Sequence, residues 1–194
     1  YRLQDKLPSA EQYLTQTVDF KDRQTSNNDY YPSPIIRKKI DTSNGLIFFS
    51  EPLKEDMIIN GAFTGEIVAS INRRDMDFGI TLYELNSKGE YFHLSYVIDR
   101  ASFSKDRSQR HLLEPHEMTR LTLPSTRMVS KQIKKGSRIV AYLNINKNAF
   151  AQLNYGSGKD VSDETLLDAN EKLIVKWYAQ SVVRIPVLRS TPKS

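Results

Sequence analysis

Residues 77–98 read DFGITLYELNSKGEYFHLSYVI, and this stretch decides the fold class. Apolar and polar residues alternate with period two on both sides of its centre, which is typical of β-strands that bury one face. The central residues Asn86-Ser87-Lys88-Gly89 are turn formers, because asparagine and glycine tolerate the backbone angles of tight turns. The stretch therefore predicts two antiparallel strands joined by a short turn.

The same alternation continues on both sides of this hairpin, from Gly45 to Asn154 and on to Val187. Short strands with one apolar face each need two packed antiparallel sheets to bury those faces. We therefore expect an all-β fold, a jelly-roll β-sandwich of about eight antiparallel strands in two sheets. Pro186 cannot donate a ladder hydrogen bond, so the last strand should lie at an edge or end there. The residues expected in the core are Ile80, Leu82, Leu94, Ile98, Ile139, Leu143, Val175 and Trp177.

The N-terminal residues 1–44 differ in character and are expected to form an irregular arm, while residues 45–194 form the sandwich. Ser9-Ala10-Glu11-Gln12 fits a capping box, which predicts one short helix. Farther along, Tyr30-Tyr31-Pro32-Ser33-Pro34 follows a polar run, and its prolines favour extended backbone. We expect this arm to wrap around the sandwich rather than to form a second domain.

The strands and turns follow one another in the order of a known family. The order includes the strand Gly45–Leu53, the turn Asn60-Gly61, the strand Asp75–Leu85, the turn Leu113-Glu114-Pro115 and the segment Lys135–Ile139. In this order and spacing, the chain resembles the C-terminal, non-catalytic domain of the X-Pro dipeptidyl-peptidase family of serine hydrolases. That family also includes cocaine esterase, α-amino-acid ester hydrolases and glutaryl-cephalosporin acylases.

The resemblance covers roughly the last three quarters of the chain and implies a jelly roll like that of galactose-binding domains. It also implies an accessory role: the domain would pack on an α/β-hydrolase domain that is absent here and help to shape its substrate site. In the family, that upstream domain carries the Ser, Asp and His triad. The chain starts with Tyr1, and together with the resemblance this favours an excised domain.

No catalytic nucleophile can be assigned in this chain. A nucleophile elbow needs Gly-x-Ser-x-Gly on a strand-to-helix turn, and the nearest approach is Gly156-Ser157-Gly158, which we interpret as a glycine-rich loop. His93, His111 and His116 have no recognisable triad partners. We therefore assign no catalytic residue and expect no enzymatic activity from this chain alone.

Two groups of residues are candidate metal ligands. Asp75 and Asp77 share one face at the mouth of a strand, where short acceptors satisfy loop backbone donors. Calcium would need about six to eight oxygen ligands there. The second group is His111, Glu114, His116 and Glu117. Pro115 lies within it and breaks any helix that would align these side chains for zinc. In relatives this turn often reads Pro-Gly. We therefore predict that the chain binds no metal and no cofactor.

The composition narrows the classes of partner. The chain has 194 residues, a formal net charge of +5 and no cysteine, so it has neither disulfides nor thiolate metal sites. Its basic residues are scattered among acidic ones, and we expect no nucleic-acid partner. No apolar run approaches the roughly 20 residues of a membrane span, and we expect no membrane association. The compartment is not indicated, and association of the chain into a homo-oligomer stays open.

Four residues are candidates for contact with the missing domain: Tyr30, Tyr31, Asn154 and Tyr155. The adjacent tyrosines have no strand face to bury them locally, and Tyr155 lies beside glycines in a loop, where we expect it to be exposed. The alternative hypothesis is a stand-alone carbohydrate-binding module, which would use these tyrosines or Trp177, with Asn148 and Asn154 nearby. Because Trp177 alternates with Leu173 and Val175, we expect it in the core instead.

Overall fold

The computed structural model describes residues 1–25, 34–42, 44–124, 126–148 and 150–188, which form thirteen β-strands. The helical elements in these ranges are two 3-10 turns, Ala101–Phe103 and Val161–Asp163. The strands are β1 (Tyr13–Val18), β2 (Ile36–Arg37), β3 (Leu46–Phe49), β4 (Met57–Gly61), β5 (Thr64–Ile71), β6 (Asp77–Leu85), β7 (Tyr91–Arg100), β8 (Thr119–Thr122), β9 (Val129–Ile133), β10 (Arg138–Ile145), β11 (Leu173–Tyr178), β12 (Val182–Arg184) and β13 (Val187–Leu188).

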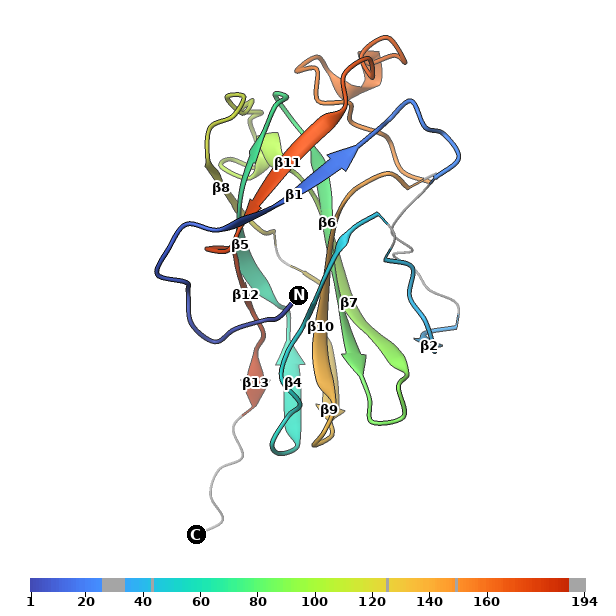
Figure 1. Ribbon diagram of the computed structural model, residues 1–194, viewed down its shortest axis with the longest axis vertical. Coiled ribbons are helices and arrows are strands. Elements are labelled where there is room, and N and C mark those ends of the chain that lie inside the picture. Colours follow the sequence, from blue (N-terminus) through green and yellow to red (C-terminus); the bar gives the residue numbers. More distant parts are fainter. Residues whose placement is uncertain (26–33, 43, 125, 149, 189–194) are drawn as a thin grey trace.

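Two five-stranded sheets form the sandwich, and a small third sheet extends one end (Figure 1). One sheet has the order β2-β7-β6-β10-β3, and the other has the order β1-β11-β5-β12, with β8 also paired to β5. The third sheet is β13-β4-β9. The paired strands of all three sheets are antiparallel. The predicted all-β sandwich is confirmed, with thirteen strands rather than about eight.

The hairpin expected from residues 77–98 consists of β6 and β7. Its turn closes on Asn86, whose side-chain Oδ1 accepts hydrogen bonds from the amides of Lys88 and Glu90 at 2.9 and 3.0 Å. Gly89 has a φ of +77°, a backbone angle that side chains disfavour. The turn predicted from the sequence is confirmed, and local chemistry alone accounts for it.

A β-bulge in β7 changes which residues reach the core. Leu82 pairs with Ser95, but the next residue, Tyr83, pairs with His93, so Leu94 is inserted between two ladder positions. Beyond the bulge, Val97 is buried and Ile98 is 38% exposed. The prediction that Ile98 lies in the core is wrong, because one inserted residue reverses the faces of an alternating strand.

The main core lies between the two five-stranded sheets. The rings of Phe78 and Trp177 pack there with their centroids 6.2 Å apart. Ile139 belongs instead to a second cluster with Ile59 and Ile133, which joins the small sheet to the sandwich. The other core predictions are confirmed: Ile80, Leu82, Ile139, Leu143, Val175 and Trp177 are buried, and Leu94 is partly buried against the core.

The N-terminal arm supplies an edge strand rather than a helix. Residues 9–12 form no helix, and β1 follows them and pairs with β11 along its whole length. Gln16 and Val18 are buried, while Thr15 and Thr17 are exposed. The period-two alternation of this strand therefore outweighs the capping-box pattern, and the predicted short helix is wrong.

Pro186 separates the last two strands. β12 ends at Arg184, and β13 begins at Val187; each lies at the edge of its sheet. The carbonyl oxygen of Pro186 still accepts a hydrogen bond from the Asn60 amide at 3.1 Å. The predicted interruption is confirmed, because proline can accept but cannot donate in a ladder.

Candidate functional site

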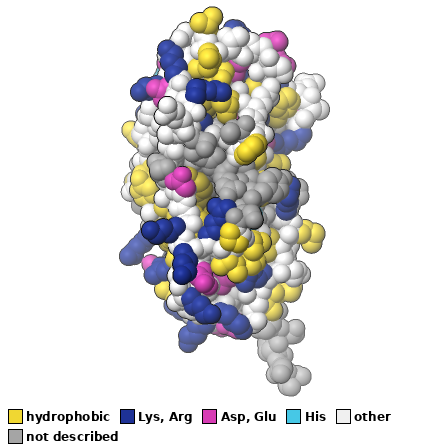
Figure 2. Space-filling model, turned by 90° about the vertical axis from the view of Figure 1, so that its right-hand side faces the viewer, with side chains coloured by type: hydrophobic (Ala, Val, Ile, Leu, Met, Phe, Trp, Pro, Cys, Tyr) yellow, Lys and Arg dark blue, Asp and Glu magenta, His cyan; other side chains and the backbone are white. Residues whose placement is uncertain are grey.

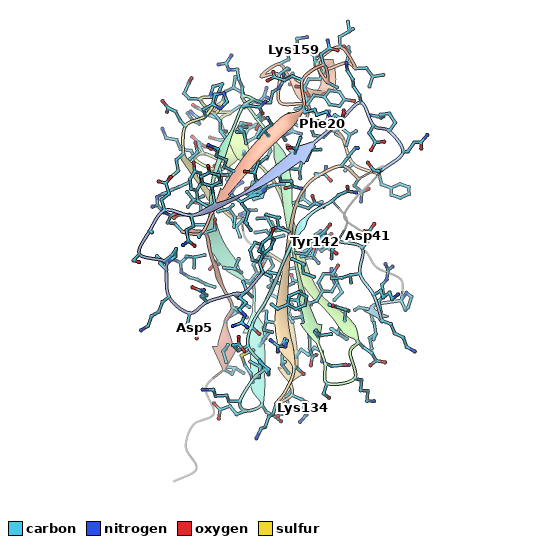
Figure 3. All side chains as sticks on the ribbon, in the orientation of Figure 1. Asp5, Phe20, Asp41, Lys134, Tyr142 and Lys159 are labelled. Atoms are coloured by element: carbon cyan, nitrogen blue, oxygen red, sulfur yellow. The ribbon has the colours of Figure 1, made fainter. Side chains whose placement is uncertain are left out.

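The loops that follow β7 and β10 gather at one end of the sandwich (Figure 1), and we call residues 101–118, 146–148 and 150–172 the loop platform. Figure 3 labels Lys159 at this end and Phe20 beneath it. Loops held by a rigid sandwich often carry the contacts that a domain makes with its partners. The polar residues singled out in the sequence, Asp75, Asp77 and Asn154, hold the base of this platform.

Asp75 is fully buried and ties the start of β6 to the first platform loop. Its Oδ1 accepts hydrogen bonds from the amides of Met76 and Ser102, at 2.9 and 3.0 Å. Its Oδ2 accepts from the Ser102 hydroxyl at 2.8 Å and from the Arg110 guanidinium at 3.0 Å. A buried carboxylate with a cation and three other donors is satisfied without a metal. The structural role that we predicted for Asp75 is confirmed.

Asp77 ties β6 to the second platform loop. Its two oxygens accept a bidentate pair of hydrogen bonds from Arg100, at 2.8 and 2.9 Å, and the hydrogen bond with Asp77 raises the pKa of the Arg100 guanidinium. Its Oδ1 also accepts from the Asn154 side chain at 2.9 Å. Asn154 in turn accepts from the Gly156 amide at 2.9 Å. Asn154 is therefore an internal brace, and only 1% of it is exposed in this domain.

The segment Gly156-Ser157-Gly158 is held by Glu164, which lies seven residues beyond the serine. The amide and the hydroxyl of Ser157 donate to Glu164 Oε1 at 2.8 and 2.5 Å, and the Tyr155 amide donates to Oε2 at 2.7 Å. A Cβ atom on Gly156 would lie 2.5 Å from the Asp75 carbonyl oxygen, so the close approach requires glycine. A serine hydroxyl that donates to a carboxylate in this way serves the loop, in agreement with its interpretation as structural.

Tyr155 is buried rather than exposed. Its ring packs edge-on against Phe20, with centroids 5.5 Å apart, and its hydroxyl accepts a hydrogen bond from Arg23 at 3.0 Å. Only 8% of the residue is exposed, so the predicted exposure is wrong. The arm after β1 provides the cover, which local sequence around the glycines cannot indicate. Tyr30 and Tyr31 lie outside the described residues, and their interface role stays a prediction.

The exposed aromatic residue of the platform is Phe150, which the sequence argument missed. The side chain is 100% exposed, although both ends of its loop are fixed. The Phe150 amide donates to Asn148 Oδ1 at 2.8 Å, and the Asn146 side chain donates to the Gln152 carbonyl at 3.3 Å. The sequence signal for this exposed ring was a single phenylalanine in a turn formed by asparagines. Arg100 and Arg110 gave no such signal, because they lie 23 and 35 residues from their carboxylate partners.

The three histidines lie in separate structural settings. His93 is buried between the rings of Tyr83 and Tyr96, with centroid distances of 5.5 and 5.9 Å. His111 and His116 donate their backbone amides to Ser102 and Ile71. His116 has a φ of +69°, which explains why glycine suits this position of the turn. Within the described part of the chain, no three His, Cys, Asp or Glu side chains gather as a metal site.

Charges of both signs mix on the surface. On the face in Figure 2, Lys and Arg side chains are interspersed with Asp and Glu side chains. Charges of opposite sign also form the ion pairs Arg73–Glu171, Lys131–Glu84 and Lys159–Asp168. No helix among the described residues is long and apolar enough to cross a membrane. The expectations of no nucleic-acid and no membrane partner stay predictions.

The comparison with known families decides the identity of the domain. The model of the X-Pro dipeptidyl-peptidase C-terminal non-catalytic domain matches residues 2–141. The chain belongs to this family. The resemblance stated from the sequence is thereby confirmed, and so is the expectation that this chain alone is non-catalytic. No curated protein matches the chain.

Solved structures of hydrolases share the fold of this X-Pro dipeptidyl-peptidase C-terminal domain. A selenomethionine-labelled α-amino acid ester hydrolase has a TM-score of 0.78 at 16% identity, covering 91% of this chain and 32% of its own. An aminopeptidase from a marine sediment Thaumarchaeota archaeon has a TM-score of 0.79 at 16% identity, covering 95% of this chain and 34% of its own. A CocE/NonD family hydrolase from Staphylococcus aureus has a TM-score of 0.55 at 11% identity, with 93% and 37% covered. The chain thus spans about a third of the length of these solved chains.

Proposed function

We propose that this domain is the accessory C-terminal part of a serine hydrolase of the X-Pro dipeptidyl-peptidase or acyl-hydrolase type. It packs on an α/β-hydrolase domain of the same polypeptide and helps to wall the substrate entrance of that domain. The family match and the coverage of about a third of longer hydrolase chains support this proposal. The whole enzyme would cleave an amide or ester by acyl transfer, with its triad and oxyanion hole in the partner domain.

The observation that carries the docking proposal is Phe150 on its braced loop. A large apolar ring that is exposed to water is well suited to be a binding anchor, because a partner that covers it removes its apolar surface from water. Asn154 and Tyr155 contribute by fixing the same loop from inside, through Asp77 and Phe20. The contact surface proposed here is therefore the loop from Asn148 to Lys159, with Phe150 as its anchor and Tyr30 and Tyr31 as further candidates.

The test combines the 194-residue chain with the separately expressed catalytic half of its parent protein. Phe150→Ser should weaken association at least about tenfold, the loss expected for an interface anchor. Met128→Ser is the matched control, because Met128 is 79% exposed in the turn before β9, outside the loop platform. Hydrolysis of p-nitrophenyl esters and Xaa-Pro chromogenic substrates by the assembled halves provides the activity readout. Equal association of both variants, each folded by circular dichroism, would contradict the anchor role.

The carbohydrate-module alternative loses part of its support. Two of its four candidate rings, Trp177 and Tyr155, are buried and cannot serve as the exposed flat ring of a sugar platform, while Tyr30 and Tyr31 lie outside the described residues. The solved structures described above are hydrolases rather than stand-alone sugar-binding modules. We therefore retain the accessory-domain function alone.

A further inference from the structure

The first three residues of the chain already form a parallel ladder with β3. The Tyr1 nitrogen donates to the Ile47 carbonyl at 3.0 Å, the Phe49 amide donates to the Tyr1 carbonyl at 3.0 Å, and the Leu3 amide donates to the Phe49 carbonyl at 2.8 Å. Arg2 is the residue that bridges Phe49 in parallel orientation. These bonds alternate between the two strands, as they do in any parallel pair.

The ladder has a defined next step. β3 is the edge strand of its sheet, and the main-chain groups of Phe49 and Ile47 that bond to residues 1–3 point away from β10. Alternation of the ladder directs the Ile47 amide to the same open side. Its matching acceptor in a parallel ladder is the carbonyl of the second residue before Tyr1. The geometry therefore prescribes both the direction and the register of a preceding segment.

A hollow lies where that segment would continue. It measures about 370 Å³, and β3 and the preceding turn contribute Asn44, Gly45 and Leu46 to its wall. The opposite wall is β1, the edge strand of the other sheet, with Thr15 and Thr17 among the lining residues. Since the Ala179 amide bonds to the Gln12 carbonyl, the alternate residues Thr15 and Thr17 direct their main-chain groups away from β11. Two open strand edges thus border one hollow.

The lining of the hollow suits a polypeptide backbone. Gln16 and Lys147 are buried polar residues in its wall, and Asp19, Asp22 and Thr25 add further polar groups. Backbone amides and carbonyls must be hydrogen-bonded when they leave water, and the outward-facing main-chain groups of the two strand edges meet that requirement.

We propose that the hollow between β1 and β3 holds the segment that connects this domain to the preceding hydrolase domain. The segment adds to β3 as a parallel strand and continues the ladder begun by Tyr1, Arg2 and Leu3. This inference rests on the proposed function for the existence of a preceding domain. It goes further by assigning the path of the connection and by placing the partner domain on the side of the sandwich where β1 and β3 open.

Amide hydrogen exchange tests the register directly. The 194-residue chain is compared by NMR with the same chain preceded by the ten residues that its gene encodes before Tyr1. The Ile47 amide should exchange about tenfold more slowly or slower still in the longer chain, as expected for a gained hydrogen bond. The Phe48 amide, which faces β10, is the internal control and should not change. Equal exchange of Ile47 in both chains would overturn the inference.

A pair of substitutions tests whether this amide matters. Ile47→Pro removes the donor, and edge strands tolerate proline on their open side. Ile47→Ala shortens the side chain and keeps the donor. The ten-residue extension should raise the thermal midpoint of the wild type and of Ile47→Ala but not that of Ile47→Pro. A rise of equal size in all three proteins would contradict the ladder, and the exchange experiment decides the case if Ile47→Pro does not fold.

A spin label locates the segment without altering the hollow. Residues 1–194 contain no cysteine, so one cysteine at the fourth residue before Tyr1, with any other cysteine of the extension replaced by serine, can carry a nitroxide as the sole thiol label. Resonances of Leu46, Thr17 and Lys147 should broaden, whereas that of Lys88, in the distant hairpin turn, should not. Absence of broadening at Leu46 and Thr17 would overturn the assigned path.

The two proposals fail in different ways. A gene that encodes no hydrolase domain before this one contradicts the proposed function. A catalytic half that binds the 194-residue chain, together with an Ile47 amide that exchanges at the same rate in the extended chain, contradicts only the path assigned to the connection.

Discussion

The indole N–H of Trp177 donates a hydrogen bond to Gln16 Oε1 at 2.9 Å. This contact connects the apolar core to a row of buried polar side chains. The Gln16 side-chain nitrogen donates to Asn144 Oδ1 at 2.8 Å, and the Asn144 side-chain nitrogen donates to the Tyr142 hydroxyl at 2.8 Å. Burial raises the pKa of Tyr142 well above its usual range, so the hydroxyl stays neutral. This row of hydrogen bonds joins β1 and β11 of one sheet to β10 of the other.

Removing the Gln16 amide should therefore destabilise the domain. Gln16→Leu leaves the Trp177 N–H and the Asn144 side chain without their buried partner, and we expect a loss of about 2–4 kcal/mol in the free energy of unfolding. Thr15→Leu, on the exposed face of the same strand, should change it by less than about 0.5 kcal/mol. Urea denaturation measures both. Equal effects of the two substitutions would show that the buried row of hydrogen bonds makes no specific contribution to the free energy of unfolding.

The bulge at Leu94 predicts a contrast between two aliphatic residues of one hairpin. Leu82→Ala removes fully packed core volume and should cost about 2–5 kcal/mol. Ile98→Ala should cost less than about 1 kcal/mol, because the bulge leaves that side chain at the surface. The free energy of unfolding from urea titration distinguishes the two. A large loss for Ile98→Ala would mean that the residue faces the core after all.

Asp99 predicts a pH-dependent contribution to stability. Burial raises the pKa of its carboxyl group, although a hydrogen bond from Arg107 at 2.5 Å acts in the opposite direction. A folded-state pKa above the unfolded value of about 3.9 stabilises the fold below that pH, and this stability is lost as the pH rises through the folded pKa.

The comparison with Asp99→Asn isolates this contribution. The stability difference between wild type and Asp99→Asn should shift in favour of the asparagine variant between about pH 3.5 and pH 7. Urea denaturation across this range measures it. A shift in favour of the wild type would mean that the Arg107 pair outweighs burial.

His116 predicts a stabilising substitution. Its φ of +69° costs a residue with a Cβ atom about 1–2 kcal/mol, whereas glycine adopts this angle freely and instead loses roughly 0.5–1 kcal/mol of backbone entropy. His116→Gly should raise the free energy of unfolding by up to about 1 kcal/mol. His116→Val should lower it, because β-branching worsens the strain. Destabilisation by glycine would indicate that the imidazole ring makes a contact that outweighs the backbone term.

The absence of a nucleophile elbow predicts a chemical result. The 194-residue chain should not react with a fluorophosphonate probe, because Ser157 donates its hydroxyl hydrogen bond to Glu164 and has no histidine base in that arrangement. The full-length parent protein should react at one serine, outside this domain. Mass spectrometry locates the labelled residue. Stoichiometric labelling of the isolated chain would refute its non-catalytic role.

The sequence alone indicated the all-β class, the central hairpin with its turn, and the family. Period-two alternation identifies strand faces because neighbouring side chains point to opposite sides of a sheet, and the Asn86–Gly89 turn closes through its own side chain and amides. The order of these elements was enough to indicate a domain of the X-Pro dipeptidyl-peptidase family. The glycine-rich loop at Ser157 was likewise interpreted correctly, because a nucleophile elbow is a local motif.

The tertiary structure decided what depends on contacts between distant residues. The insertion of Leu94 became visible only from its partner strand, and it placed Ile98 at the surface. Tyr155 is covered by Phe20, which lies far away in the sequence, while Phe150 has no such cover. The hollow between β1 and β3 exists because two edge strands from different sheets approach each other. Local alternation specifies the two faces of each strand, but pairing register and packing between distant segments determine which of those faces is covered.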